Sequence, residues 1–374
     1  MSTAVAPRMA GRSTQPRNAA YDNLKVVLVM AVIVGHALVA YGAVGSWAYS
    51  EPSDNEVFNI VANLLVSFGV LFAMGLFFLI AGLFTPRSLA RKGIGRFMRD
   101  RLLRFGIPFV LYLFVVFPLV EWAGSGAPGS VWDGLSAVAD ERDPGPLWFV
   151  FVLLIFSFAY AGVRVVLPAR MRSGPRLGAF LFGLAAAVTV GTFLVRLEFP
   201  LDSFQQFSLH LWQWPQCLGL FVLGTTAAER GWLDSVPVRV RRWCGWAASV
   251  GAAGIVTAFA IDHQRFEPYA GGWTWQAGVT AVCEGLVSVG FAVWALDRFQ
   301  RHHSRAAPVG RAAGRAAYGA YILQAPVLVG LALSLQHLGL PPEVKFLIVA
   351  PLGVAISFGA AWLLSRIPGV RRVI

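Results

Sequence analysis

A histidine lies inside a long apolar segment of this chain, on the same predicted helical face as a lysine and an aspartate. His36 stands in VVLVMAVIVGHALVAY, eleven residues after Lys25, and Lys25 follows Asp22 by three residues. At about 100° per residue, eleven residues return a helix to within roughly 20° of the same face and advance it about 16 Å. Asp22 is then close enough to pair with Lys25. The stripe offers a cation at the membrane rim and a deep imidazole, which suits general acid–base chemistry.

Glu284 is a second ionisable residue in the middle of an apolar segment, QAGVTAVCEGLVSVGFAVW. A carboxylate at that depth is expensive, which makes it a candidate for function. His36 and Glu284 have similar predicted depths, so a contact between them is one possibility. The other possibility is that both residues have structural roles. His36 would then form a hydrogen bond to a neighbouring helix, and Glu284 would pair with an Arg or His on another helix. We take both as candidate catalytic residues.

Two further groups of side chains are candidates for binding. The segment 87–104 carries seven Lys and Arg residues. Guanidinium groups beside a membrane cavity bind phosphate in bidentate fashion, although such a segment also serves topology and lipid-headgroup contact. Gln and Trp residues, among them Trp148 and Gln324, lie in or near the apolar segments. This combination suits sugar-like or polyol ligands, whereas Trp at the end of a span is more often part of the interfacial belt.

The elements that position these residues are predicted to be transmembrane helices. Hydrophobic residues make up 57% of the chain and charged residues 13%, about half the charged share of a soluble domain. Each apolar run is close to the roughly 20 residues that a helix needs to cross a bilayer. The sequence therefore predicts an all-α polytopic bundle of about ten transmembrane helices. The ten runs are 26–44, 58–85, 106–122, 147–167, 177–195, 210–228, 243–261, 275–296, 316–335 and 344–364.

The distribution of charge predicts the orientation of the bundle. With the N-terminus placed in the cytoplasm and ten spans alternating, 27 of the 31 Lys and Arg residues fall on cytoplasmic segments. This is a strong positive-inside pattern, and it places both termini in the cytoplasm. The net charge of +12 is therefore a consequence of topology, and the lipid bilayer rather than nucleic acid is the expected partner. We divide the chain into a basic leader (1–20), a transmembrane domain (21–365) and a short basic tail (366–374).

Five segments resemble, in order, the acyltransferase 3 family of integral membrane O-acyltransferases. They are YDNLKVVLVMAVIVGH, FFLIAGLFT, RFMRDRLLRFGIPF, PLWFVFVLL and YGAYILQAPV. The family's basic residue, ten residues and a histidine correspond to Lys25 and His36. The chain departs from the family pattern at three positions. Lys25 stands where Arg is usual, Ala81 stands where the second-span motif often has Ser, and Gln324 stands where the penultimate-span motif often has His.

The resemblance implies transfer of an acyl group, with acetyl as our expectation, from acyl-CoA to a hydroxyl of a sugar, polysaccharide or small molecule. His36 is then the general base, and Asp22, Lys25, Arg101 and Arg104 bind the donor. We assign Trp148 and Gln324 to the acceptor, and expect acyl-CoA as co-substrate with no bound cofactor or metal. The expected location is the cytoplasmic membrane of a bacterium. A transporter for a small polar or sugar-like solute is the alternative, but we find no repeated halves with matching broken helices, and a scaffold without chemistry is a third reading.

Overall fold

The structure is a computed structural model that describes residues 19–141, 143–167, 176–201, 203, 208–233, 235–262, 267–304 and 308–370. Residues 1–18 of the predicted leader and 371–374 of the predicted tail lie outside this described part. The first helix begins at Ala19. The predicted boundary between leader and membrane domain therefore falls within the first turn of a helix.

Nine helical segments in the described part of the chain are long and apolar enough to cross a membrane. This confirms the all-α polytopic class. The segments are α1 (Ala19–Tyr41), α2 with α3 (Glu56–Val70, Ala73–Lys92), α4 to α6 (Ile94–Arg101, Ile107–Leu111, Phe117–Gly124), α8 (Trp148–Val166), α9 (Leu177–Glu198), α11 (Val238–Ile261), α13 (Trp275–His302), α14 (Pro308–Leu335) and α15 (Pro342–Leu364).

The sixth predicted run forms α10 (Trp214–Arg230), a helix of 17 residues. It follows a single 3₁₀ turn at Leu211–Gln213 and is shorter than each of the nine segments above. Two further helices, α7 (Val131–Glu141) and α12 (Glu267–Ala270), lie in the connections. Every predicted run thus corresponds to a helix, although one helix is shorter than a typical span.

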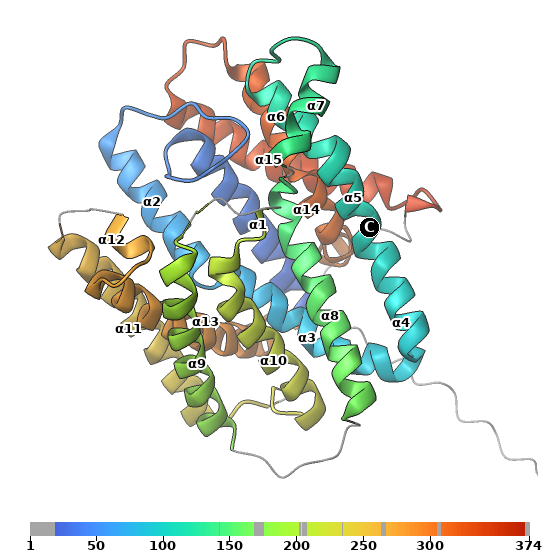
Figure 1. Cartoon of the computed structure of the whole chain (residues 1–374), viewed down its shortest axis with the longest axis vertical. Coiled ribbons are helices and arrows are strands. Elements are labelled where there is room, and N and C mark those ends of the chain that lie inside the picture. The colour runs from blue at the N-terminus through green and yellow to red at the C-terminus, as the bar shows by residue number, and fades with distance from the viewer. Residues whose placement is uncertain are drawn as a thin grey trace, which may run out of the picture.

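Helix α1 lies inside the bundle and packs against α14, α15, α13, α2 and α3 (Figure 1). Close packing elsewhere depends on glycine. A Cβ on Gly82 of α3 would lie 2.5 Å from the backbone oxygen of Phe221, and one on Gly224 of α10 would lie 2.3 Å from that of Leu79. Small residues let membrane helices approach this closely, because lipid supplies no hydrophobic force to press them together. The α3–α10 crossing is therefore fixed by two glycines.

The second predicted span is broken between α2 and α3, and the break explains the glutamines of the sixth run. Gln216 donates from Nε2 to the carbonyl oxygens of Val70 and Leu71 at 3.2 and 2.7 Å, and its Oε1 accepts from the Gly75 amide at 3.1 Å. Gln213 donates to Val70 at 3.1 Å. Backbone groups freed inside a membrane need such partners, so the two amide side chains compensate for the interrupted helix.

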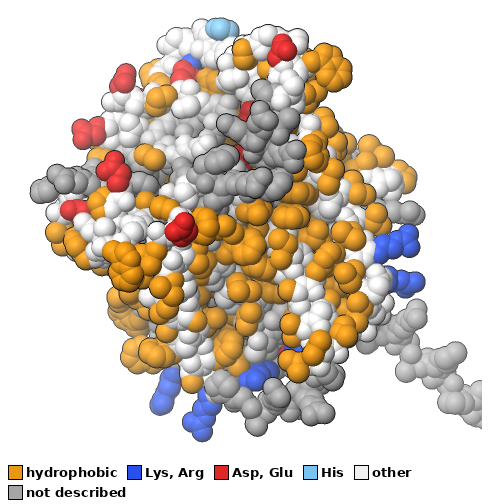
Figure 2. All heavy atoms as spheres, viewed as in Figure 1, with side chains coloured by type: hydrophobic (Ala, Val, Ile, Leu, Met, Phe, Trp, Pro, Cys, Tyr) orange, Lys and Arg blue, Asp and Glu red, His pale blue; other side chains and the backbone are white. Residues whose placement is uncertain are grey.

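The charged residues separate toward two ends of the molecule. Figure 2 shows Asp and Glu on the upper part of one face, Lys and Arg along its lower and right-hand edges, and hydrophobic side chains between them. We call the end where α1 begins and α15 ends the basic end, and the end where α1 finishes at Tyr41 the opposite end. Which end faces the cytoplasm stays a prediction.

Candidate active site

A cavity of about 1490 Å³ opens at the basic end. Its described lining carries eight Lys and Arg residues against two Asp residues, an excess that suits a ligand with several phosphates. All four residues predicted to bind a donor line it: Asp22, Lys25, Arg101 and Arg104. The other lining cations are Arg87, Arg91, Lys92, Arg315 and Arg366.

The cations of this cavity are held in place by their neighbours. Lys25 lies 2.7 Å from the Asp22 carboxylate, as the three-residue spacing predicts. The guanidinium of Arg101 lies 5.1 Å from the ring centres of both Phe97 and Phe105, and it donates to Thr85 at 3.2 Å. Contact with two aromatic rings restricts the position of the guanidinium, and its remaining N–H donors are available to an anion. Arg101 is thereby preorganised to bind an anion.

His36 contacts Gln324 across the bundle. Its Nδ1 lies 3.0 Å from Oε1 of Gln324. An amide oxygen only accepts, so Nδ1 carries the proton and Nε2 keeps its lone pair. The Gln324 Nε2 is buried and has no hydrogen-bond partner in the described part of the chain. The contact therefore leaves one basic nitrogen and one free amide donor side by side.

His36 lies closer to the opposite end of the bundle than its sequence position indicates. The predicted run extends to residue 44, but α1 ends at Tyr41, five residues after the histidine. The chain then folds back, and the ring of Trp47 stacks on His36 with centres 4.2 Å apart and planes 12° apart. His36 is partly buried. Its ring is thus covered on one face by a connecting segment rather than surrounded only by helices.

Buried ion pairing holds that connecting segment on α15. Lys345 is buried and donates to Glu51 at 2.6 Å and to the Gln336 carbonyl at 3.1 Å. Ser53 donates to Glu343 at 2.6 Å. Glu51 and Ser53 follow Trp47 in the same connection, so these contacts anchor to α15 the segment whose indole stacks on His36.

A second histidine, His210, lies in the connection that leads to α10, immediately before the 3₁₀ turn at Leu211–Gln213. Its ring stacks on Trp148, with centres 4.7 Å apart, and its Nδ1 donates to the Ser208 carbonyl at 2.5 Å. Burial lowers the pKa of His210 to about 4, so the ring is neutral at pH 7. Sequence reasoning missed this residue, because it stands at the edge of an apolar run and no spacing relates it to His36. Trp148, which the sequence analysis assigns to acceptor binding, is the ring that stacks on His210.

Three aromatic rings lie at the deep end of the basic cavity. Phe77, Phe149 and Tyr321 all line it, and their ring centres are 5.0 to 6.2 Å apart. Tyr321 precedes Gln324 by one helical turn, and Val29, the deepest lining residue of α1, precedes His36 by two. Two turns advance a helix by about 10 Å. The cavity therefore approaches His36 without including it.

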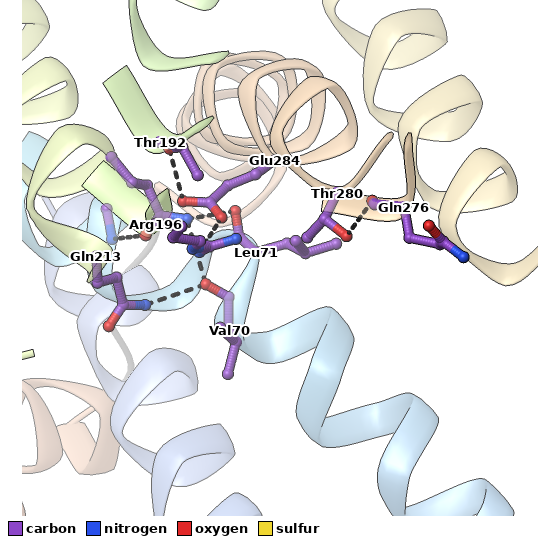
Figure 3. A network of polar contacts seen from close by, with 10 residues as sticks. Val70, Leu71, Thr192, Arg196, Gln213, Gln276, Thr280 and Glu284 are labelled. Carbon is purple, nitrogen blue, oxygen red and sulfur yellow. Dashed lines mark hydrogen bonds and ion pairs between the residues drawn. The ribbon is translucent and has the colours of Figure 1, made fainter. Parts of the chain in front are cut away.

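Glu284 belongs to a separate polar cluster (Figure 3). It accepts from Arg196 at 2.5 Å and from Thr192 at 3.4 Å, and all three side chains are buried. The structural possibility considered from sequence, an Arg on another helix, is thus realised. No hydrogen bond or ion pair joins Glu284 to His36 in the described part of the chain, and a catalytic role for Glu284 stays a prediction.

Comparison with known proteins agrees with this arrangement. A family described as an acyltransferase domain, acyltransferase 3, matches residues 18–366. No curated protein and no solved structure matches the chain. The match spans every helix described above, including those that carry the basic cavity and His36. The chain belongs to the acyltransferase 3 family and is a membrane acyltransferase.

Proposed function

We propose that this protein transfers an acyl group from acyl-CoA to the hydroxyl of an acceptor, with His36 as general base. The observation that carries the proposal is the placement of His36 on α1. The helix lines a basic cavity with Asp22, Lys25 and Val29 at one end, and presents an imidazole bound to Gln324 nearer the other.

The basic cavity supplies the donor site. Lys25, Arg101 and Arg104 bind the phosphates of coenzyme A, and the pantetheine arm extends toward His36. The rise from Lys25 to His36, about 16 Å, is of the same order as that extended arm. To reach the imidazole, the thioester passes Phe77, Phe149 and Tyr321, which line the deep end of the cavity.

In the proposed reaction, one proton moves from the acceptor to His36 and then from His36 to the departing thiolate. Nε2 of His36 takes the proton of the acceptor hydroxyl as its oxygen attacks the thioester carbonyl carbon. The carbon–sulfur bond then breaks, and the imidazolium returns the proton to the departing thiolate. Nδ1 stays hydrogen-bonded to Gln324 throughout. The free Nε2 donor of Gln324 is suitably placed to stabilise negative charge that develops on the carbonyl oxygen.

The acceptor binds on the other side of His36 from the donor cavity. The aromatic rings there, Trp47 beside His36 and Trp148 beside His210, offer flat surfaces to a small molecule or to the end of a glycan. The positive-inside pattern supports a donor cavity that opens to the cytoplasm, the side from which acyl-CoA would enter. The family match supports a multi-pass membrane protein, which we assign to the cytoplasmic membrane of a bacterium.

The test uses purified full-length protein in lipid nanodiscs with labelled acetyl-CoA, and measures free coenzyme A together with labelled product. His36→Ala should lower the turnover number by at least about a hundredfold, the usual contribution of a general base. His337→Ala, a histidine in the exposed connection after α14, is the matched control and should retain activity. Normal transfer by His36→Ala rules out the mechanism, and solute flux without turnover would indicate a transporter.

A further inference from the structure

The ion pair of Arg196 and Glu284 leaves buried donors unused. Arg196 is 3% exposed and gives Nη2 to Glu284, whereas its Nε and Nη1 have no hydrogen-bond partner in the described part of the chain. The Nε1 of Trp212, 5% exposed, is also without one. Its ring centre lies 5.6 Å from the guanidinium carbon of Arg196. Unpaired buried donors are costly and rare in native proteins, so this group of donors needs a partner.

The charges of the cluster define what that partner is. Arg196 and Glu284 neutralise each other, so a ligand need not carry charge. The unused groups are N–H donors only, which require oxygen acceptors. A carboxylate ligand would bring a second negative charge close to Glu284, and like charges at short range repel strongly in a buried site. The cluster is therefore suited to hydroxyl, ether or carbonyl oxygens of an uncharged molecule.

The cluster is connected to the proposed reaction centre by a row of rings. Trp212 lies 5.6 Å from His210, and His210 stacks on Trp148 at 4.7 Å. Trp148 belongs to the same hydrophobic core as Ile33 and Ala37, which lie on either side of His36 in α1. Arg196 lies near the end of α9, two residues before Glu198, and the 3₁₀ turn that carries Trp212 leads into α10. The unused donors thus lie beside a row of rings that leads toward the core around His36, and none of these residues lines the basic cavity.

We propose that Arg196 and Trp212 form a subsite for the acceptor, which rests on the function proposed above. The subsite binds non-reacting oxygens of an uncharged, oxygen-rich acceptor while the reacting hydroxyl lies at His36. Glu284 holds the guanidinium in place and makes the subsite neutral. It is thereby a positioning residue for binding, and acceptors that carry a carboxylate at this point are selected against.

Direct binding tests the subsite without requiring acyl transfer. The probes are methyl glucopyranoside, methyl rhamnopyranoside and myo-inositol, titrated calorimetrically into full-length protein in nanodiscs. Trp212→Phe keeps the ring and removes only the Nε1 donor. It should weaken binding of the probe by about five- to tenfold, the effect of one hydrogen bond. Trp246→Phe on α11, 67% exposed, is the control and should bind as the unmodified protein does.

Two comparisons separate a ligand site from a structural pair. Arg196→Lys keeps a cation for Glu284 but removes the planar set of donors, so it should fold with a normal thermal transition and bind the probe at least about tenfold more weakly. Methyl glucuronide, which differs from methyl glucopyranoside by a carboxylate, should bind more weakly than its uncharged counterpart.

The inference is overturned if none of the three uncharged probes binds, if Trp212→Phe binds as tightly as the unmodified protein, or if the glucuronide binds more tightly. Loss of binding in Trp212→Phe together with full transfer by His36→Ala would retain the subsite and reject the proposed mechanism. The reverse pattern would retain the mechanism and reject the subsite, so the two failures are distinguishable.

Discussion

The Nδ1 of His36 and the Oε1 of Gln324 are 3.0 Å apart, although the two residues are 288 positions apart in the chain. The contact fixes the tautomer of the imidazole and the orientation of its ring. A general base must be directed at the proton that it removes, so the amide is as much a part of the proposed reaction centre as the ring.

Gln324→Leu should therefore lower activity while leaving donor binding intact. Leucine has a similar volume and offers no acceptor to Nδ1, so the ring loses its fixed orientation. We expect the turnover number to fall by about tenfold or more with an unchanged KM for acyl-CoA. Gln324→His, whose ring nitrogen also accepts a hydrogen bond, should recover part of the rate. Equal rates for the leucine variant and the unmodified protein would show that this contact is not required.

Removal of a cavity cation should weaken donor binding. Lys25→Met and Arg101→Gln should each raise the KM for acyl-CoA by about tenfold, because a charge-assisted hydrogen bond to phosphate contributes about 1.5 to 3 kcal/mol. The effect should shrink at high salt. Arg239→Gln changes an exposed arginine at the start of α11 and is the control. A KM that is insensitive to both cavity variants would place the donor elsewhere.

Loss of Glu51 should destabilise the protein. Glu51→Gln leaves the ammonium of Lys345, with a side chain 2% exposed, without its counter-charge, and an uncompensated buried charge costs about 3 to 5 kcal/mol. The free energy of unfolding in mixed micelles measures the loss. Asp100→Asn breaks a more exposed pair with Lys92 and should cost less than about 1 kcal/mol. Similar losses in the two variants would contradict this account.

Stability should decrease in mildly acidic solution because of His210. Its pKa in the folded protein is about 4, below the value of about 6.5 in an unfolded chain. Between these values the unfolded state binds the extra proton, so stability falls as the pH decreases from 6.5 toward 4. His210→Gln should flatten the dependence of the melting temperature on pH in that interval. An unchanged slope would assign the acid sensitivity to other groups.

Substitution of Gly224 should separate α3 from α10. A Cβ at this position would lie 2.3 Å from the Leu79 backbone oxygen, and backbone cannot move aside as a flexible side chain can. Gly224→Ala should lower stability by about 1 to 3 kcal/mol. Gly183→Ala on α9, where nothing lies within 4 Å of the added atom, should be neutral or slightly stabilising. A melting temperature that is unaffected by Gly224→Ala would be inconsistent with the glycine crossing.

Local features of the fold could be predicted from the sequence because they depend on helix geometry and hydropathy. The Asp22–Lys25 pair follows from a three-residue spacing, and the helices follow from the apolar runs. The break at Leu71 was not predicted, since it depends on Gln213 and Gln216, which reach it from another helix. Hydropathy identifies apolar segments, but it does not show which residues of another helix contact them.

The composition of the site was harder to predict than its position on α1. Glu284 was correctly singled out as costly, but its partner Arg196 could be identified only when α9 and α13 were packed together. Gln324 was assigned to acceptor binding because of its amide side chain. Its contact with His36 was not predicted, because it joins two helices that are far apart in the sequence. His210 and Trp47 lie in connections whose paths no periodicity describes, so neither was predicted.

The placement of Lys25 and His36 on one unbroken helix has a mechanical consequence. In the proposed mechanism, the hydrogen-bonded backbone between these residues fixes the distance from the cation that binds the donor phosphates to the imidazole that meets the thioester. One inserted residue would swing the imidazole by about 100° and displace it by about 1.5 Å. Trp47 and His210 lie in connections outside this helix. Acceptor preference can therefore diverge through those connections while the length of the accepted donor stays constant.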